Sequence, residues 1–561
     1  MSEFLLSLAI ESVDDFVCAA RRCRDLACGS YLLSEVSKAC ALRLHLIHRA
    51  VLIYPNTPDP ANELQPGPPF IAVNRILACV SAPDEGALRK IVADCKSFTQ
   101  NYLATVELDP ALANAARTLA SDGIEINSGT ARNHVLSLVE FYAAWAALDP
   151  GRSNYASARA LAEKRLDSRL SLNNFNPHAG ESDILKSSLD GFRESVLQRT
   201  GTKTENQYFV RSDEELDGVA ILKRFGGGGR RKFVFDSTLD VAAVAYKERI
   251  KRTHPTVVAG YHRFLDVHSK VLPNTDAFLY PLESRRIKDP ELRAELDHII
   301  KPLESARPEA PYYALLNGDG DGMGSCIANT LKTMEEHQRF SLALSAFARD
   351  VLRMFQNMTS PGECIYAGGD DVMALLPLHL ALSYARKIRE VFAKHMHPWP
   401  VTFSAGIAVA HALEPLDDVR RLAAAAETQA KSVPGKDALA IIVTPRSGAD
   451  ISAAGKWDDI IPAVEKIAKL YASRQLSKSL GHELRTLLNR WKGDLQAQAD
   501  LDDALPSLAI AIAKKKKQEL GEQALTLVSA ISSRHDLETL VDNLFVARPF
   551  ARAMREAGES Q

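Results

Sequence analysis

The sequence predicts an α+β fold in which two ferredoxin-like units are joined to helical segments. Two observations support this prediction. The apolar runs between residues 312 and 443 follow the order βαββαβ, and a shorter strand–helix–strand–strand–helix order begins at Phe4. With 561 residues, the chain is also long enough for about three or four domains. We expect the domains at 1–125, 126–305, 306–448 and 449–561.

The N-terminal unit begins with Phe4–Ile10, an apolar run typical of a buried strand. Tyr31–Ala50 has the spacing of an amphipathic helix, and Val51–Tyr54 and Ile71–Val80 are expected strands. Between these strands, Pro55–Pro69 is rich in proline, asparagine and glycine, which indicates a loop. The order resembles a split βαβ unit.

Two other parts of the chain favour helices. Residues from about 110 to 300 are mostly polar with helical spacing of their apolar positions, which predicts a helical middle domain. After Gly448 we expect helices to the end of the chain.

The most regular part of the sequence lies between Pro311 and Val443. We expect these elements in chain order: strand Tyr312–Leu316, helix Ser325–Met358, a hairpin over Cys364–Leu376, helix Ala381–Met396, strand Val401–Ala410, helix Asp417–Lys431 and strand Asp437–Val443. The right-handed crossover rule places the first strand beside the second strand of the hairpin, as parallel neighbours.

Two acidic turns follow apolar runs in this unit, Asn317–Asp321 and Gly368–Asp371. Aspartates supply the hard oxygen ligands that Mg²⁺ prefers, and glycines let the backbone approach a ligand closely. Together the turns would form a two-metal site for in-line phosphoryl transfer. The alternative is that each is an ordinary Asp-Gly hairpin turn.

From this pattern we assign roles to individual residues. The expected catalytic residues are Asp370 and Asp371, and the expected metal ligands are Asp319, Asp321, Asp370 and Asp371. The alternative for Asp321 is that it only shapes the turn. Nucleotide contacts are expected from Gly322, Met323, Gly324, Gly368, Gly369 and Lys436. The first three suit triphosphate binding at a helix N-terminus, and Lys436 would neutralise phosphate charge unless it is a turn lysine in solvent.

Composition excludes several classes of protein. The formal net charge is −2, so there is no global basic field, and a nucleic acid would bind local patches or come through other proteins. The eight cysteines contain no Cys-x-x-Cys pair, so we expect free thiols and no zinc. No apolar run reaches membrane-spanning length, and the expected compartment is the cytoplasm.

Three stretches resemble one known family. Gly318–Gly324, Tyr366–Asp371 and Ser404–Ile407 are similar to the palm polymerase of the large subunit of type III-B (Cmr-type) CRISPR effector complexes. The resemblance continues in these further segments: Arg24–Leu26, Gly29–Ser34, Asn74–Ala78, Lys186–Gly191 and Lys436–Ile441.

The resemblance implies two palm domains of the adenylyl cyclase and polymerase type, with helical middle and C-terminal domains. It implies conversion of ATP into cyclic oligoadenylate messengers for antiviral defence, with Mg²⁺ or Mn²⁺ as cofactor. Target RNA bound to a guide RNA would switch this activity on, within a complex of other Cmr-type subunits. By resemblance alone, Ser404 is expected to face the base.

The sequence departs from the family pattern in two ways. Many members begin with a His-Asp nuclease domain, whereas here a palm-like strand starts at Phe4, so we expect no DNA cleavage by this chain. Many members also carry a zinc site of cysteines in the middle domain, and this sequence has no cysteine between Cys95 and Cys326.

Two alternatives stay open at the level of sequence. A free-standing nucleotidyl cyclase, such as a diguanylate cyclase, would use the same palm on GTP. A catalytically silent scaffold would bind ATP inside an RNA-guided complex without turning it over. The additional domains argue against the first alternative, and the complete acidic set argues against the second.

Overall fold

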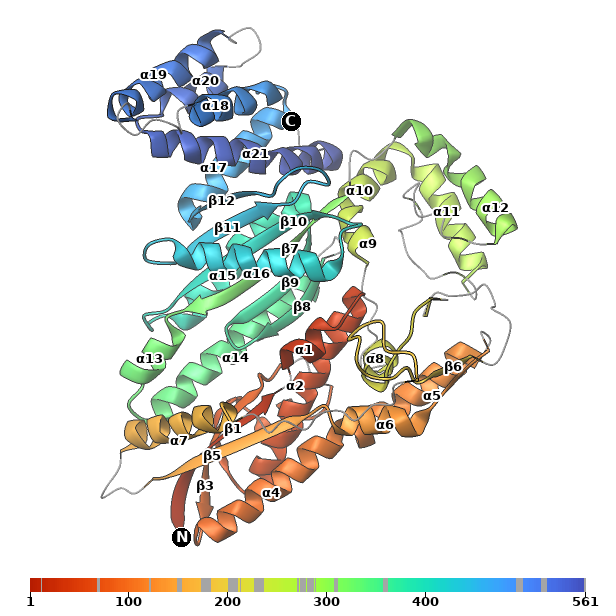
Figure 1. The fold of residues 1–561 in the computed structure, drawn as a ribbon, viewed down its shortest axis with the longest axis vertical. Helices are drawn as coiled ribbons and strands as arrows, with labels where there is room; N and C mark the ends of the chain where they lie inside the picture. The colour runs from red at the N-terminus through yellow and green to blue at the C-terminus, as the bar shows by residue number, and fades with distance from the viewer. Residues whose placement is uncertain are drawn as a thin grey trace.

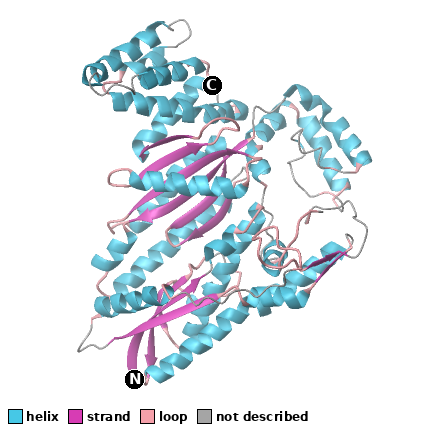
Figure 2. Cartoon of the chain, viewed as in Figure 1, coloured by secondary structure: helices cyan, strands magenta, loops and turns pink. Residues whose placement is uncertain are grey.

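The computed structural model describes residues 1–11, 13–67, 71–120, 123–148, 154–172, 183–199, 210–211, 213–226, 237–269, 272, 279, 287, 289–306, 311–356, 362–490, 498–515 and 522–558. Two sheets and their helices form the body of the molecule, with the N-terminus and C-terminus at opposite ends of the view (Figure 1). The mixture of helices and sheets (Figure 2) confirms the predicted α+β class.

The first sheet has the strand order β2-β3-β1-β5. Its strands are β1 (Ser2–Glu11), β2 (Val51–Tyr54), β3 (Arg75–Ala82) and β5 (Glu140–Leu148). The helices of this part are α1 (Val13–Cys18), α2 (Cys23–Leu46), α3 (Pro60–Glu63), α4 (Glu85–Tyr102), a π-helix (Leu103–Glu107), α5 (Leu108–Leu119), α6 (Ser128–Leu136) and α7 (Tyr155–Leu170). Leu6, Leu8 and Ile10 of β1 point into one core with α2 and α4.

Strand β5 corrects the expectation that the chain is mostly helical beyond residue 110. It pairs with β1 from Glu11↔Glu140 to Glu3↔Leu148, so it completes the N-terminal sheet. Its sequence is rich in alanine, which favours a helix locally, but pairing with the buried edge of β1 outweighs that preference. We therefore propose that the first domain extends past residue 125 to include this strand.

The middle of the chain carries short elements. They are β4 (Ile124–Ile126), which pairs with β6 (Leu197–Arg199), and α8 (Gly218–Phe225), α9 (Thr238–Ala242), α10 (Val244–Thr253), α11 (Pro255–Val267), α12 (Pro290–Ile300) and a 3₁₀ helix (Lys301–Ala306). Helix α8 packs against α2 through a buried ion pair between Arg224 and Asp25, 2.6 Å apart.

The second sheet has the order β12-β11-β10-β7-β9-β8. Its strands are β7 (Tyr312–Asp321), β8 (Glu363–Gly368), β9 (Asp371–Pro377), β10 (Thr402–His411), β11 (Ala438–Val443) and β12 (Ile451–Lys456). Its helices are α13 (Met323–Asn329), α14 (Met334–Gln356), α15 (Ala381–Met396) and α16 (Leu416–Ser432), with a 3₁₀ turn at Leu378–Leu380.

The predicted neighbours β7 and β9 do pair, but they are antiparallel, so the expected parallel direction is wrong. The reason is the hairpin: β8 leads directly into β9 with reversed direction, so β9 opposes β7. The expected single helix from Ser325 to Met358 is also wrong. It is broken after α13, because Thr333 and Glu336 begin α14 with reciprocal side-chain to backbone hydrogen bonds.

The C-terminal part holds helices α17 (Trp457–Ala472), α18 (Lys478–Arg490), α19 (Gln498–Lys515), α20 (Glu522–Ser529) and α21 (Arg534–Ala557). It is not helical from Gly448 onward as expected, because β12 extends the second sheet first. Trp457 is 2% exposed and donates its indole N–H to the Phe403 carbonyl at 2.9 Å, which joins this helical part to β10. In the described ranges, every helix is too short or too polar to cross a bilayer.

Helix α14 lies between the two sheets (Figure 1) and is held to both. The loop after β2 reaches it through Asn56, whose backbone N–H donates to Ser341 Oγ at 2.8 Å. Glu63 pairs with Arg349 at 3.0 Å, and Tyr155 of α7 contacts His337 at 2.8 Å. The N-terminal sheet is therefore fixed against the second sheet close to the acidic turns.

Candidate active site

The hairpin between β8 and β9 carries two of the predicted acidic residues. Its register pairs Gly368 with Asp371, so only Gly369 and Asp370 form the turn. Gly369 has φ +62°, a left-handed conformation that disfavours side chains with a Cβ. This tight turn places Asp370 and Asp371 at the tip of the hairpin.

Strand β7 brings Asp319 to the same place. Because β7 and β9 are antiparallel with Gly318 opposite Val372, the end of β7 lies beside the start of β9. One carboxylate oxygen from each of Asp319, Asp370 and Asp371 lies within 4.8 Å of the other two. The structure therefore joins the two distant motifs into one cluster of three carboxylates, and oxygen ligands in this number suit a hard divalent cation.

The pKa values of the three carboxyl groups are shifted in different directions. Removal from water, followed by repulsion from Asp319, raises the pKa of Asp370 to about 7. Burial and the Asp370 charge also raise the pKa of Asp371. Although burial opposes it, hydrogen bonds from Asp371 and Lys431 lower the pKa of Asp319. Three carboxylates at this distance favour either a shared proton or a bound cation.

Lys431 is a site residue that the sequence reasoning missed. Its ammonium group, on α16, forms ion pairs with Asp319 and with Glu427, the latter at 2.6 Å. Glu427 in turn accepts a hydrogen bond from Asn317 Nδ2 at 2.6 Å. These ion pairs raise the pKa of Lys431 even though burial opposes the shift. The signal that could have found it is the i,i+4 spacing of Glu427 and Lys431 on a predicted helix.

Gly406 of β10 allows α16 to carry Lys431 this close. A Cβ at Gly406 would lie 2.1 Å from the Glu427 backbone nitrogen, so only glycine permits the helix to rest directly on the strand. This close approach sets Glu427 over Asn317 and Lys431 over Asp319. The glycine of the Ser404–Ile407 motif therefore acts through helix packing.

Asp321 and Ser404 are both buried and hydrogen-bonded to each other. Asp321 is 4% exposed, and its carboxylate accepts from the Ser404 hydroxyl at 2.6 Å and from the Thr402 hydroxyl at 3.0 Å. Both hydrogen bonds go to Oδ2, while the buried Oδ1 has no hydrogen-bond partner among the described residues. Asp321 lies outside the group of three carboxylates within 4.8 Å of one another, and its role as a metal ligand stays a prediction. Ser404 has 0% exposure and its hydroxyl is engaged by Asp321, so its expected contact with a base stays a prediction.

The other predicted nucleotide contacts lie in two turns, one after β7 and one before β11. Gly322 precedes α13 with φ +77°, followed by Met323 and Gly324 in the first turn of that helix. Lys436 lies exposed in the turn before β11 with φ 47°, and its carbonyl accepts a hydrogen bond from Lys456 Nζ. The structure thus places Lys436 near the same edge of the sheet, while the ammonium group on the carboxylates belongs to Lys431.

The N-terminal sheet contributes to the hairpin tip. A Cβ at Gly369 would lie 3.0 Å from Tyr54 Oη and 3.1 Å from Val73 Cγ1. Burial, with a further effect of the Asp370 charge, raises the pKa of Tyr54 well above its usual value. The neutral phenol of Tyr54, from the N-terminal sheet, therefore lies against the acidic hairpin.

Comparisons with known families agree with this geometry. Residues 312–440 match the family model for the second palm domain of Cas10/Cmr2, and residues 5–80 match the model for the N-terminal part of CRISPR-associated protein Cmr2. A curated relative, CRISPR system Cmr subunit Cmr2 of Pyrococcus furiosus, is 29% identical over 229 residues, which is 36% of this chain. The match spans 25% of that relative's length.

Solved structures share the fold over nearly the whole chain. The cryo-EM structure of type III-B Cmr-beta in the apo state has a TM-score of 0.62 at 13% identity, covering 100% of this chain and 82% of that one. Type III-B Cmr-beta bound to cognate target RNA has a TM-score of 0.64 at 13% identity, covering 97% and 83%. At this identity the likeness establishes the shared fold.

Proposed function

We propose that this chain is a Cmr2-type protein, that it is the catalytic large subunit of a type III-B RNA-guided complex, and that it converts ATP into cyclic oligoadenylates. The observation that carries the proposal is the cluster of Asp319, Asp370 and Asp371 with Lys431, set on the sheet that matches the Cas10/Cmr2 palm. The product would serve as a messenger in antiviral defence, in the cytoplasm.

The three carboxylates fit a divalent cation, either Mg²⁺ or Mn²⁺. Burial and repulsion from Asp319 raise the pKa of Asp370, and a cation bound among the three carboxylates would relieve that repulsion. When bound, such ions would activate the attacking 3′-hydroxyl of one ATP and stabilise the pyrophosphate that leaves the other. We assign Asp319, Asp370 and Asp371 as the residues that would hold them.

The remaining residues would bind and orient the nucleotide. Once cations share the negative charge of Asp319, the Lys431 ammonium group becomes available to a phosphate oxygen, for which lysine acts as a point charge. Gly368 and Gly369 present backbone at the hairpin tip, and the turn at Gly322–Gly324 presents backbone beside Asp319. Lys436 remains a second proposed phosphate contact.

We further propose that a guide RNA, a target RNA and other Cmr-type subunits are the partners of this chain. The support is the fold shared over 97% of the chain with Cmr-beta bound to cognate target RNA. Binding of the target would be the event that turns the palm on.

Mass spectrometry of products from labelled ATP tests this proposal. The assembled complex is incubated with Mg²⁺ or Mn²⁺, with and without matching target RNA, and with a chelator as a further arm. We expect cyclic oligoadenylates only with target RNA and metal, because the carboxylates cannot work without a cation. ATP that stays bound and unchanged would instead indicate a scaffold. A product from GTP, or one formed without RNA, would indicate a free-standing cyclase.

A pair of matched variants tests the site. Asp370→Ala plus Asp371→Ala should reduce product to background while leaving complex assembly intact. The control is Asp458→Ala plus Asp459→Ala, which removes another adjacent Asp-Asp pair that is exposed at the start of α17. Unchanged turnover in the first variant would overturn the site assignment.

A further inference from the structure

The turn between α16 and β11 has a strained backbone. Gly435, Lys436 and Asp437 follow one another with φ of +74°, +47° and +46°. This left-handed conformation suits glycine, but it is disfavoured for a residue that carries a Cβ. Two such residues in succession persist only where the surrounding structure holds them. The contacts that hold this turn therefore decide how Lys436, a proposed phosphate contact, is presented.

Arg389 of α15 holds the turn through the side chain of Asp437. Its Nε donates to Asp437 Oδ1 at 2.9 Å, and its Nη2 donates to Asp437 Oδ2 at 2.7 Å. Paired hydrogen bonds between two charged groups fix the orientation of the carboxylate as well as its distance. The Arg389 and Asp437 side chains are 25% and 27% exposed, so water competes for these bonds less than at an open surface.

The backbone of Asp437 connects this turn to the end of β7. Its N–H donates to Asp321 Oδ2 at 3.2 Å. Asp321 is the last residue of β7, and Gly322, which follows it with φ +77°, begins the turn into α13. Hydrogen bonds therefore run from Arg389 through Asp437 to Asp321. They connect the two turns in which proposed nucleotide contacts lie, one before α13 and one before β11.

Arg389 is itself held in place by α17. Its guanidinium carbon lies 5.9 Å from the centroid of the Trp457 ring, and Trp457 is 2% exposed. Arg389 Nη1 also lies 3.5 Å from Asp458 Oδ1, but the Asp458 side chain is 87% exposed, and an ion pair in water contributes little. The buried ring of Trp457 therefore provides the firm contact that places the guanidinium beside Asp437.

We propose that Arg389 is a positioning residue for nucleotide binding. Through Asp437 it keeps the turn in the left-handed backbone that presents the Lys436 ammonium group to a phosphate of ATP. This inference rests on the proposed function of the same site. Among the described residues, Arg389 forms its ion pairs with Asp437 and Asp458 and none with the cluster of three carboxylates. Its loss should therefore weaken ATP binding and leave the chemical step almost unchanged.

Steady-state kinetics of the assembled complex with target RNA tests the proposal. Arg389→Met should raise KM for ATP by about three- to tenfold and leave kcat nearly unchanged, because it removes support for binding and not for the reaction. Lys436→Met should show the same pattern, since both variants remove the same phosphate contact. An unchanged KM in Arg389→Met would overturn the proposal.

A double-mutant cycle tests whether Arg389 acts through Asp437. Asp437→Asn keeps the backbone N–H that donates to Asp321 and removes the charge with which Arg389 pairs. We expect Asp437→Asn to raise KM as much as Arg389→Met does, and the double variant to raise it no further. Independent effects that multiply would overturn the proposal, because Arg389 would then act by another route.

Arg386 provides a control on the same helix. It lies one turn earlier on α15 and pairs with Glu465 of α17 at 3.3 Å, so it joins the same two helices through a different ion pair. Arg386→Met should leave KM unchanged. A rise in KM equal to that of Arg389→Met would overturn the proposal, because a weaker contact between α15 and α17 would then explain both variants.

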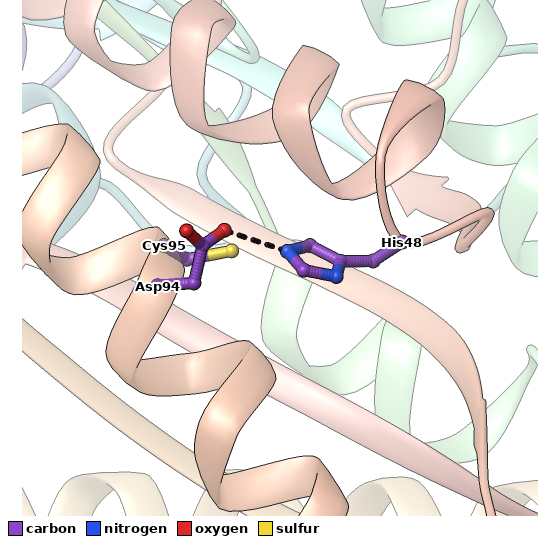
Figure 3. Close-up of side chains that lie close together, drawn as sticks. All are labelled: His48, Asp94 and Cys95. Carbon is purple, nitrogen blue, oxygen red and sulfur yellow. Dashed lines mark hydrogen bonds and ion pairs between the residues drawn. The ribbon is translucent and has the colours of Figure 1, made fainter.

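Arg43 provides a control with the same chemistry in another part of the molecule. It donates to both oxygens of Asp94, at 2.8 and 2.7 Å, and its guanidinium carbon lies 4.5 Å from the centroid of the Phe98 ring. His48 also contacts Asp94, at 2.7 Å (Figure 3). Arg43→Met removes paired hydrogen bonds of the same kind and should leave KM unchanged. An equal rise in KM would indicate a general loss of rigidity and would overturn the proposal.

Proteolysis of the full chain provides a readout that needs no product. A lysine-specific protease cleaves after Lys436 when the turn opens, and the exposed Lys332 provides a reference within the same chain. We expect Arg389→Met and Asp437→Asn to speed cleavage after Lys436, relative to cleavage after Lys332, on the order of tenfold. Arg386→Met should leave this ratio unchanged. Equal ratios in the native chain and in the first two variants would overturn the proposal.

Failure of this inference and failure of the proposed function give different results. A native complex that makes no product would overturn the proposed function, while the cleavage ratio still shows whether Arg389 holds the turn. Equilibrium binding of ATP to the same variants then replaces KM, with the same expected ratios. If Arg389→Met does not fold, Asp437→Asn decides the question, because it leaves Arg389 against Trp457.

Discussion

In the two large sheets of the molecule the first strand lies between the third and the fourth, and the second strand stands at the edge beside the third. The N-terminal sheet runs β2-β3-β1-β5 and the second sheet contains β10-β7-β9-β8, and all these pairs are antiparallel. The sheets differ in the connection between their second and third strands. It is a two-residue turn after β8 and a twenty-residue segment, 55–74, after β2.

This difference shows how one topology serves two roles. The tight turn places Asp370 and Asp371 beside Asp319, which lies near the end of β7, so this turn forms the carboxylate cluster. The long connection brings Asn56 and Glu63 into contact with α14 and brings Val73 close to the tip of the acidic hairpin. It therefore holds the N-terminal sheet against the second sheet. Chemistry in this fold therefore depends on the length of one loop and the residues at its tip.

Among the variants that test this difference, Lys431→Met is expected to have the largest effect. The variant leaves three carboxylates without their cationic neighbour and removes the proposed phosphate contact, so product formation should fall on the order of 10- to 100-fold. Initial rates of labelled product at saturating Mg²⁺ measure this.

The matched variant is Lys436→Met, which removes an exposed lysine from the turn at the same edge of the sheet. We expect a smaller loss of rate, since the ammonium group on the carboxylates belongs to Lys431. A larger loss in Lys436→Met than in Lys431→Met would show that the two lysines have the opposite roles.

A moderate effect is expected from Gly369→Ala, which tests the contact between the N-terminal sheet and the tip of the acidic hairpin. The new methyl group would sit in a left-handed backbone and 3.0 Å from Tyr54 Oη, so the free energy of unfolding should fall by about 1–2 kcal/mol. Denaturant unfolding measures this. Gly260→Ala is the control, because its methyl group would meet only Ile299 at 3.6 Å. An equal loss of stability in Gly260→Ala would show that the contact with Tyr54 is not the cause of the effect at Gly369.

At neutral pH the smallest effect is expected from His337→Gln at the contact between α7 and α14, because its titration contributes only on acidification. Burial, with a further effect of the Arg159 charge, lowers the pKa of His337 to about 4. At a pH below the ordinary histidine pKa of about 6.5, the folded chain therefore binds fewer protons than the unfolded chain. This contribution to stability is complete above about pH 6.5 and is lost as the pH falls toward about 4, on the order of 2–3 kcal/mol.

Thermal unfolding of the native chain and the variant between these pH values measures the difference. The native chain should lose more stability on acidification than His337→Gln, whose amide does not titrate. Parallel pH profiles would contradict the expectation and would mean that this contact does not depend on a neutral imidazole.

The fold and the carboxylate cluster were accessible from sequence because their signals are local. Gly368–Asp371 sits between two short apolar runs, and Asp319 follows another, so the sequence places both motifs at strand ends. The antiparallel pairing of β7 with β9, which was not predicted, is what brings them together. Strand β5 was missed because its alanines favour a helix, and only the partner strand β1 decides otherwise.

Side-chain roles that depend on packing were not accessible in this way. Lys431 reaches Asp319 because α16 rests on Gly406, and no local pattern encodes that approach. Asp321 differs from Asp319 only by two positions along β7, which should have placed both on one face of the strand. The hydroxyls of Thr402 and Ser404 on the neighbouring strand instead draw its carboxylate inward.

The junction at Trp457 ties the behaviour of the C-terminal helices to that of the palm. Side chains of β7, β9 and β10 share one continuous core with those of α17, α18 and α21. Neither part can open without exposing the other, so the two form a single cooperative unit in unfolding. A palm excised before Trp457 would carry a large apolar surface into water and would aggregate, which makes the C-terminal helices a requirement for handling this protein in isolation.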